Sequence, residues 1–346
     1  MAEQADKLQV ETIVKNILET IEKEREREII ARRYGLFDRK ETLEQIGELL
    51  GITRERVRQL EKAIITRLKS QAEQGNVPHV SEVESAVSQL LETNGAAARV
   101  SVLVKQLTGL TGKLDQSRVA FLAMLCPKLS VVDENDFYYQ SVALASVYKD
   151  SKALTSKVDD IVKTVKAIGE PSNIKAIAQE AKSDNEMRVE ALASLSKSLA
   201  HLNGDWGLIK WPTVNPKNIR DKIYVILREN GKQMHFSEIS VKIKESDFKR
   251  KDVTTQAIHN ELIKDDRFVL VGRGIYALKE WGFKKGTVSD VITEILAKAN
   301  EPLHRDEIVK RVLKNRYVKE TTILLNLQGK KQFKRVAKAT YALAED

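Results

Sequence analysis

The stretch ITRERVRQLEKAI, residues 52–64, carries a dense set of hydrogen-bonding side chains on what its apolar spacing predicts to be one helix. Guanidinium, ammonium, carboxylate and carboxamide groups are the groups that bond to phosphates and to base edges in a DNA groove. Those that could do so here are Arg54, Glu55, Arg56, Arg58, Gln59 and Lys62. A charge run of this kind is more often the solvated, salt-bridged face of a surface helix. The residues around the stretch decide between the two interpretations.

Helix-ending signals on both sides of the stretch predict a helix-turn-helix. Thr42 is placed to cap a helix that begins at Leu43, and Gln45 occupies the capping-box position. Gly51 supplies the left-handed residue that ends this helix, and Thr53 caps the next one. The second helix has an inward apolar stripe of Val57, Leu60, Ile64 and Leu68. Two helices joined by a three-residue turn are a common DNA-binding geometry, so the turn favours the groove interpretation.

Side chains for other chemistry are absent or scattered. The sequence has no GxxxxGK(S/T) phosphate loop and no paired-carboxylate nuclease pattern, so we expect no catalytic residue. The single cysteine, Cys126, excludes an internal disulfide and a cysteine-rich zinc site. The five histidines lie far apart in the chain. We therefore expect a protein that is not an enzyme and that has no metal site and no cofactor.

Composition indicates a folded protein of several domains with a basic C-terminal part. The chain has 346 residues, and it lacks an apolar run of the ~20 residues that a membrane span needs, so no membrane contact is expected. Residues 215–346 hold 28 Lys and Arg against 18 Asp and Glu, a net charge of +10, whereas the remainder holds 30 against 31, a net charge of −1. The basic part could attract phosphate or an acidic protein surface. The lone cysteine and the polar N-terminus predict an intracellular location.

Four related segments follow residue 80. In each, an amphipathic helix pattern begins 15 or 16 residues before the start of a second helix, and these starts are Arg99, Asn173, His235 and His304. The last two segments also share an ending, because RFVLVGRGIYAL and QFKRVAKATYAL place tyrosine eight residues after phenylalanine. Each segment is predicted to have three helices and then a β-hairpin, and Arg273 lies at the turn of the third hairpin. Three helices followed by a β-hairpin make a winged helix.

The predicted fold class is therefore mainly α, with an N-terminal helix-turn-helix followed by tandem winged-helix modules. The helix-turn-helix domain is predicted at residues 1–72, the degenerate winged helices at 80–148 and 152–213, and the more regular ones at 215–282 and 286–346.

The segment EREREIIARRYGLFDRKETLEQIGELLGITRERVRQLEKAIITRL resembles region 4 of bacterial sigma factors, the domain that reads the −35 promoter element. The resemblance covers about the first 70 residues. It implies that the second helix enters the major groove with Arg54, Glu55 and Gln59 as base readers. It also places Arg56, Arg58 and Lys62 near phosphates or the groove wall. Thr42 and Thr53 at the two helix starts, and Arg273 in the third hairpin, complete the predicted DNA-binding set.

About 20 residues precede this resemblance. The aromatic-rich domain with which a complete sigma factor melts DNA and binds the polymerase clamp is therefore not expected. An ordinary initiation factor is not expected either.

Residues 217–281 resemble the HARE-HTH winged-helix domain, and the stretch DRFVLVGRGIYALKEW carries the similarity. That family includes the delta subunit of Gram-positive RNA polymerase and modules attached to restriction endonucleases. The resemblance implies a role in transcription or DNA transactions without catalysis. Because the delta subunit uses this domain for polymerase binding, both DNA and polymerase stay open as partners of these modules.

The sequence thus predicts a sequence-specific DNA-binding protein in transcription regulation, cytoplasmic and associated with the nucleoid. Double-stranded DNA is the expected partner, and RNA polymerase is a second one that the sequence leaves open. One alternative is an accessory subunit of RNA polymerase that docks through its sigma-like domain. Another is the DNA-recognition component of a restriction or defence system. The oligomeric state and the target DNA sequence do not follow from these patterns.

Overall fold

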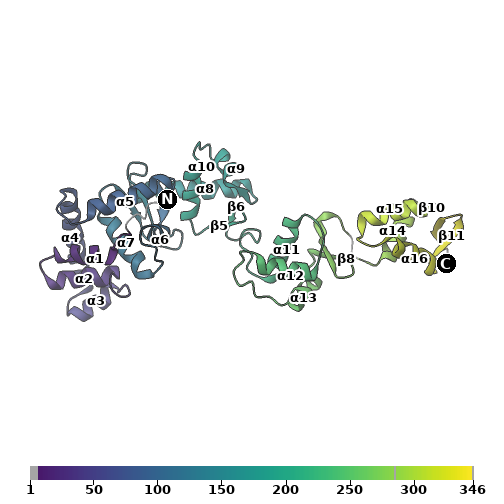
Figure 1. Cartoon of the computed structure of the whole chain (residues 1–346), viewed down its shortest axis with the longest axis horizontal. Coiled ribbons are helices and arrows are strands. Elements are labelled where there is room, and N and C mark those ends of the chain that lie inside the picture. Colours follow the sequence, from purple (N-terminus) through teal and green to yellow (C-terminus); the bar gives the residue numbers. More distant parts are fainter. Residues whose placement is uncertain (1–6, 284–285, 345–346) are drawn as a thin grey trace. The chain divides into compact units, whose positions relative to one another are not determined.

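The computed structural model describes residues 7–283 and 286–344 of a chain that divides into two compact units, Met1–Lys210 and Trp211–Asp346. The described residues are mainly helical, with 56% of the chain in 16 helices, and they form four small antiparallel sheets (Figure 1). The finer domain boundaries within each unit stay predictions.

The first unit begins with the predicted helix-turn-helix. Its helices are α1 (Val10–Glu19), α2 (Glu24–Tyr34), α3 (Leu43–Leu50) and α4 (Arg54–Glu73). The fully buried side chains of Ile29, Ile46 and Val57 join α2, α3 and α4 in one core. Packing of this apolar stripe leaves the opposite face of α4 to solvent. The helix-turn-helix that the sequence predicted is confirmed.

Four segments with the same order of elements follow: helix, short strand, two helices, two strands. In the first unit they are α5 (Val80–Thr93), β1 (Ala97–Arg99), α6 (Val100–Thr108), α7 (Lys113–Leu125), β2 (Leu129–Val132) and β3 (Ser141–Leu144), then α8 (Ser151–Ile168), β4 (Ser172–Asn173), α9 (Ile174–Glu180), α10 (Glu186–Leu195), β5 (Leu199–Leu202) and β6 (Asp205–Leu208).

The second unit holds the other two segments. They are α11 (Ile219–Asn230), β7 (Met234–His235), α12 (Phe236–Glu245), α13 (Thr255–Lys264), β8 (Phe268–Gly272) and β9 (Ile275–Leu278), then α14 (Val288–Ala299), β10 (Leu303–His304), α15 (Arg305–Asn315), α16 (Glu320–Gly329), β11 (Phe333–Ala337) and β12 (Thr340–Leu343). A short 3-10 helix, Lys279–Trp281, lies between them.

Each segment closes with a three-stranded antiparallel sheet in which the last strand lies in the middle. The orders are β1-β3-β2, β4-β6-β5, β7-β9-β8 and β10-β12-β11. The short strand before the second helix was not predicted, because a two- or three-residue strand has no periodicity of its own. The β2–β3 and β5–β6 hairpins pair over four residues each, so the first two segments differ from the others in sequence more than in pairing.

The helix α7 joins the helix-turn-helix to the first segment. It packs against α1, α2 and α4 as well as against α5 and α6. Arg118 Nε donates a hydrogen bond to Leu36 O at 2.9 Å, and Arg118 Nη2 pairs with Glu11 Oε2 at 2.9 Å. The ring of Phe121 lies 5.3 Å from that of Tyr34, centroid to centroid. The helix-turn-helix and the first segment therefore share a core.

Phe121→Ala tests this shared core. Phe121 is 1% exposed, and removing a buried aromatic side chain should lower the free energy of unfolding by about 3–5 kcal/mol. The measurement is urea unfolding of the full chain, with amide hydrogen exchange read residue by residue. Exchange should accelerate in α1 and α2 as well as in α5 and α6, because α7 supports both groups.

The control is Leu114→Ala, on the same helix but 38% exposed, which should change stability much less. If Phe121→Ala accelerated exchange in residues 80–148 alone, the helix-turn-helix would be an independent folding unit.

Candidate nucleic-acid interface

The turn between α3 and α4 is fixed by its caps. Thr42 Oγ1 accepts a hydrogen bond from Gln45 N at 3.2 Å, and Gln45 Oε1 accepts one from Thr42 N at 2.9 Å, so the predicted capping box is present. Gly51, with φ of 65°, ends α3. Thr53 Oγ1 accepts from Arg56 N at 3.2 Å and caps α4. A hydroxyl that accepts one bond here keeps its own hydrogen to donate, as it could to a phosphate oxygen.

Gly47 positions α3 against this turn, and the sequence analysis did not single it out. A Cβ atom at Gly47 would lie 2.6 Å from Ile52 O, and Ile52 N donates to Gly47 O at 2.9 Å. Any side chain at this position would push the start of α4 away from α3. A glycine inside an otherwise helical pattern was the available signal, because it lowers helix propensity unless close packing requires it.

The outward face of α4 presents the predicted side chains to solvent. All of the following are exposed: Arg54, Glu55, Arg56, Arg58, Gln59 and Lys62. On the inner face Val57, Ile64 and Leu68 are at most 1% exposed. The apolar stripe therefore fixes the rotation of α4 and brings the six polar residues together on one surface.

Glu55 is the centre of the hydrogen bonds on this surface. Its carboxylate accepts two bonds from Arg58, at 2.7 Å and 2.8 Å, and a longer one from Gln59 Nε2 at 3.4 Å. The bidentate bond to Arg58 lowers the pKa of Glu55, and the same bond raises the pKa of Arg58. Arg54 and Lys62 make no hydrogen bond or ion pair with another described residue. The surface thus combines a preorganised acceptor with two unpaired cations.

Two ion pairs behind this surface hold α2 against α4, and sequence reasoning missed both. Glu26 Oε2 lies 2.9 Å from Arg67 Nη2, with side-chain exposures of 12% and 49%. Glu61 Oε2 lies 3.3 Å from Arg33 Nε. The hydrogen bond from Arg67 lowers the pKa of Glu26 against the opposing effect of burial. Glu26 and Glu61 lie on the mostly apolar inner side of their helices. A carboxylate at such a position indicates a buried ion pair, and this was the signal in the sequence.

Arg273 and the other predicted site residues belong to different units. Arg273 is exposed in the turn between β8 and β9, in the second compact unit, whereas the other eight belong to the first. The candidate interface on α3 and α4 therefore consists of those eight residues.

The described residues contain no group of three or more His, Cys, Asp or Glu side chains that could hold a metal ion. Cys126 is buried, and burial raises the pKa of its thiol to about 12, which makes the thiolate inaccessible near neutral pH. No helix in the described ranges is long and apolar enough to cross a membrane.

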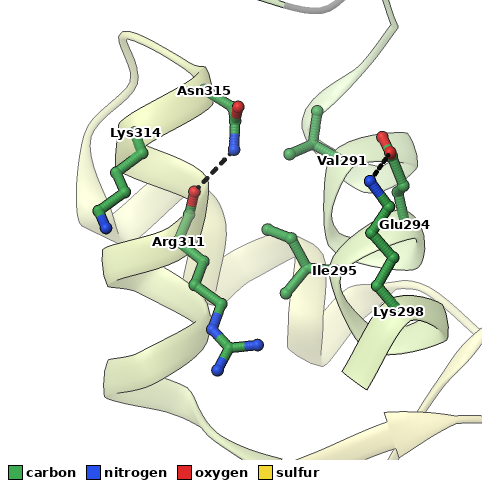
Figure 2. Close-up of a pocket in the computed structure, with 7 residues that line it drawn as sticks. All are labelled: Val291, Glu294, Ile295, Lys298, Arg311, Lys314 and Asn315. Atoms are coloured by element: carbon green, nitrogen blue, oxygen red, sulfur yellow. Dashed lines mark hydrogen bonds and ion pairs between the residues drawn. The ribbon is translucent and has the colours of Figure 1, made fainter. Parts of the chain in front are cut away.

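A groove of about 310 Å³ lies between α14 and α15 in the second unit (Figure 2). Val291 and Ile295 provide its apolar side. Of the cations around it, Lys298 pairs with Glu294 at 2.9 Å, and Arg311 bonds to Glu307 at 2.6 Å. Lys314, which also lines the groove, is the one lining cation without an ion pair to a described residue. A single such cation is weak support for an anion site, and the groove is not part of the candidate interface.

Comparison with known proteins supports the assignment of the N-terminal part. Residues 23–70 match the family described as sigma-70, region 4. Similar proteins include the RNA polymerase sigma factors SigA of Microcystis aeruginosa (44% identical over 57 residues), RpoD of Helicobacter pylori (42% over 66) and SigA1 of Synechococcus elongatus (50% over 46).

These similarities are confined to one region. They cover 16%, 18% and 13% of this chain and 14%, 9% and 12% of those relatives, so the chain spans a small part of the length of the relatives it matches. Residues 23–70, which contain α2, α3 and most of α4, are a sigma-70 region 4 domain.

The variant Arg67→Met tests the ion pair that supports α4. It keeps the aliphatic stem but leaves the largely buried Glu26 carboxylate with the more exposed Lys23, at 3.4 Å, as its remaining ionic partner. We expect a loss of about 1–2 kcal/mol at pH 7, moderated by solvent around Arg67. The folded-state pKa of Glu26 lies below the ordinary value of 4.5, so the pair stabilises above that pH. Its contribution is lost as the pH falls through the lowered pKa, and the difference from wild type should shrink there.

Urea unfolding at a series of pH values measures both effects. Lys69→Met, at an exposed position of α4, is the matched control and should have little effect at any pH. A difference between Arg67→Met and wild type that stayed constant down to pH 3 would show that Arg67 acts through packing alone.

Proposed function

We propose that this chain is a sequence-specific DNA-binding protein in transcription regulation, with α4 in the major groove of a promoter-like element. One observation carries the proposal. The sigma-70 region 4 match includes a helix whose apolar stripe is buried and whose six predicted DNA-contacting residues are all exposed. A helix held in this way by a second helix and a short turn fits the major groove of B-DNA.

The chemistry of the exposed face suits base reading. Arg54 pairs with guanine O6 and N7, Gln59 pairs with adenine, and Glu55 accepts from cytosine N4. The Arg54 side chain bonds to no other described residue, so it can meet DNA without breaking a bond within the protein. A carboxylate has about four acceptor positions, so Glu55 can keep its two bonds to Arg58 while it accepts one from a base. Arg58 therefore has two roles, as a cation near the phosphates and as the group that orients Glu55.

Arg56 and Lys62 act near phosphates or the groove wall. Thr42 and Thr53, at the exposed starts of α3 and α4, lie where backbone N–H groups and hydroxyls can bond to phosphate oxygens.

The four αβααββ segments are, in this proposal, winged-helix modules, and the third is of the HARE-HTH type. Their shared order of elements and their terminal hairpins support this assignment. They add contacts with DNA, with polymerase or with both, and they have no catalytic role, metal or other cofactor. The protein would act in the cytoplasm on the nucleoid.

A second candidate function is an accessory subunit of RNA polymerase. The relatives that match residues 23–70 are RNA polymerase sigma factors by name, and this favours polymerase as a partner. A DNA-recognition component of a restriction or defence system is the third candidate. Affinity purification of the tagged full chain separates them, because polymerase, a nuclease or DNA alone would accompany it.

Substitution of the base readers tests the main proposal. Arg54→Ala or Gln59→Ala should each cost about 1–3 kcal/mol of binding free energy on the preferred site and relax the base preference at one position. Arg58→Ala should weaken binding to all sequences and also blunt the preference that Glu55 reads. The measurements are selection of the preferred site from random duplexes and titration of duplexes that carry single base changes.

Lys105→Ala, at an exposed position of α6, is the control for loss of one positive charge and should keep the preference. A triple Ala variant at Arg54, Glu55 and Gln59 that still selected the wild-type site would refute the assignment of α4 as the reading helix.

A further inference from the structure

The third helices of the four segments, α7, α10, α13 and α16, differ in how much of their surface is left open to a binding partner. α7 is enclosed by five helices of the first unit, and α10 packs against β1 of the preceding segment. At that contact Tyr139 N donates to Leu195 O at 2.9 Å, and Arg99 Nε donates to Ser194 O. The other two helices bury a single stripe each, which consists of Ile258 and Leu262 in α13 and of Ile323 and Leu327 in α16. Among the described residues, the third helix is therefore open to a partner in the two segments of the second unit, α13 and α16.

The two open helices, α13 and α16, differ in the charge that they and their hairpins carry. Residues 255–278, from α13 to the end of its hairpin, contain three cations and three carboxylates. The cation Arg267 is neutralised by Asp265, at 2.8 Å, and Asp221, at 3.2 Å. The helix and hairpin of the third segment therefore offer little net charge beyond Arg273.

The corresponding part of the fourth segment is strongly basic. Residues 320–343, from α16 to the end of its hairpin, contain five cations and one carboxylate, Glu320. The cations are Lys330, Lys331, Lys334, Arg335 and Lys338, and all are exposed. None of them forms an ion pair with a described residue. A charge run is usually a solvated face laced with salt bridges, whereas this one has a single carboxylate, Glu320, for five cations.

The fold gathers these cations beside the open helix. Phe333 and Tyr341 turn inward, at 7% exposure each, and fix the hairpin on the core of the segment. Lys334 and Arg335 follow on β11, and the loop of residues 330–332 connects the hairpin directly to α16. In Figure 1 α16 and β11 lie together near the C-terminal end. The exposed residues of α16 are uncharged after its first position and include Thr321, Thr322 and Gln328, which can donate hydrogen bonds to phosphate oxygens.

We propose that the surface formed by α16 and the β11–β12 hairpin, residues 319–340, binds the phosphate backbone of duplex DNA irrespective of its sequence. We call it the 319–340 surface. Lys334, Arg335 and Lys338 are its principal contacts. The fourth segment, rather than the Arg273 hairpin of the third, then supplies most of the DNA affinity of the second unit.

Duplex DNA fits this surface better than an acidic protein does. The 319–340 surface has six cations and one carboxylate, Glu320 at the start of α16. Such an excess of one sign suits a dense, uniform polyanion, whereas protein interfaces are depleted in lysine and use both signs of charge. The identification of the partner as DNA also rests on the proposed function of α4. A second cationic surface on the same chain meets the same duplex at high effective concentration.

Two matched triple variants test the proposal in the full chain. One is Lys334→Ala, Arg335→Ala, Lys338→Ala. The other removes the same charge from exposed positions of the third segment: Lys232→Ala, Lys244→Ala, Lys249→Ala. Affinity for a preferred and an unrelated duplex is measured over a range of salt concentrations, and circular dichroism checks that each variant is folded.

We expect the first triple variant to bind both duplexes more weakly and to flatten the dependence of log affinity on log salt by about 2–3, since each lost phosphate contact removes about 0.9. The preferred sequence should stay the same, because phosphate contacts position a protein without reading bases. The control triple should change the slope by less than one such contact. Equal effects of the two triples, or an unchanged slope for the first, would overturn the proposal.

Two further outcomes keep this proposal distinct from the function proposed for α4. A flattened slope in a protein that shows no sequence preference would support the 319–340 surface and reject α4 as a reader. A first triple variant that kept its slope on DNA but lost binding to purified RNA polymerase would assign the surface to a protein partner and overturn the proposal.

Discussion

The enclosure of α7 is the constraint on which the rest of the first unit depends. Its Phe121 is almost fully buried, and the Arg118 guanidinium beside it bonds to Leu36 O, Glu11 and Asp115. A buried guanidinium is tolerated only when its donors are satisfied, so these bonds fix the register of α7 on the helix-turn-helix as well as its position. Because α7 packs against α2 and α4, the polar face of α4 with Arg54, Glu55 and Gln59 is left as exposed surface of the helix-turn-helix.

The parts of this fold that follow from local rules could be predicted from the sequence. Thr42, Gln45, Gly51 and Thr53 define the α3–α4 turn because caps and a left-handed glycine depend only on neighbouring residues. The hairpin of the third segment was predicted for the same reason. The docking of α7 and α10 on other segments was not, because it depends on surfaces far away in the chain.

A signal for that docking was nevertheless present. The run VAFLAML in α7 is apolar around the whole helix, and a helix that is apolar all round is a buried one. The candidate site was predictable in its residues but not in its internal bonds. That Arg58 holds Glu55 depends on side-chain rotamers, and sequence spacing permits the pair without requiring it.

In the proposed function, the two surfaces of the chain would divide DNA binding according to charge. Residues 1–210 carry 30 cations and 31 carboxylates, so the unit that contains α4 has a net charge of −1 and little long-range attraction for a polyanion. On the proposed function, the affinity of this unit for DNA would come from short-range, directional bonds, which are the bonds that distinguish bases. The second unit has the opposite balance, with 28 cations against 18 carboxylates, and five of the cations lie in residues 321–344, which contain no carboxylate. The second unit would therefore keep the chain on DNA by a long-range attraction that salt weakens, while the first unit selects the site.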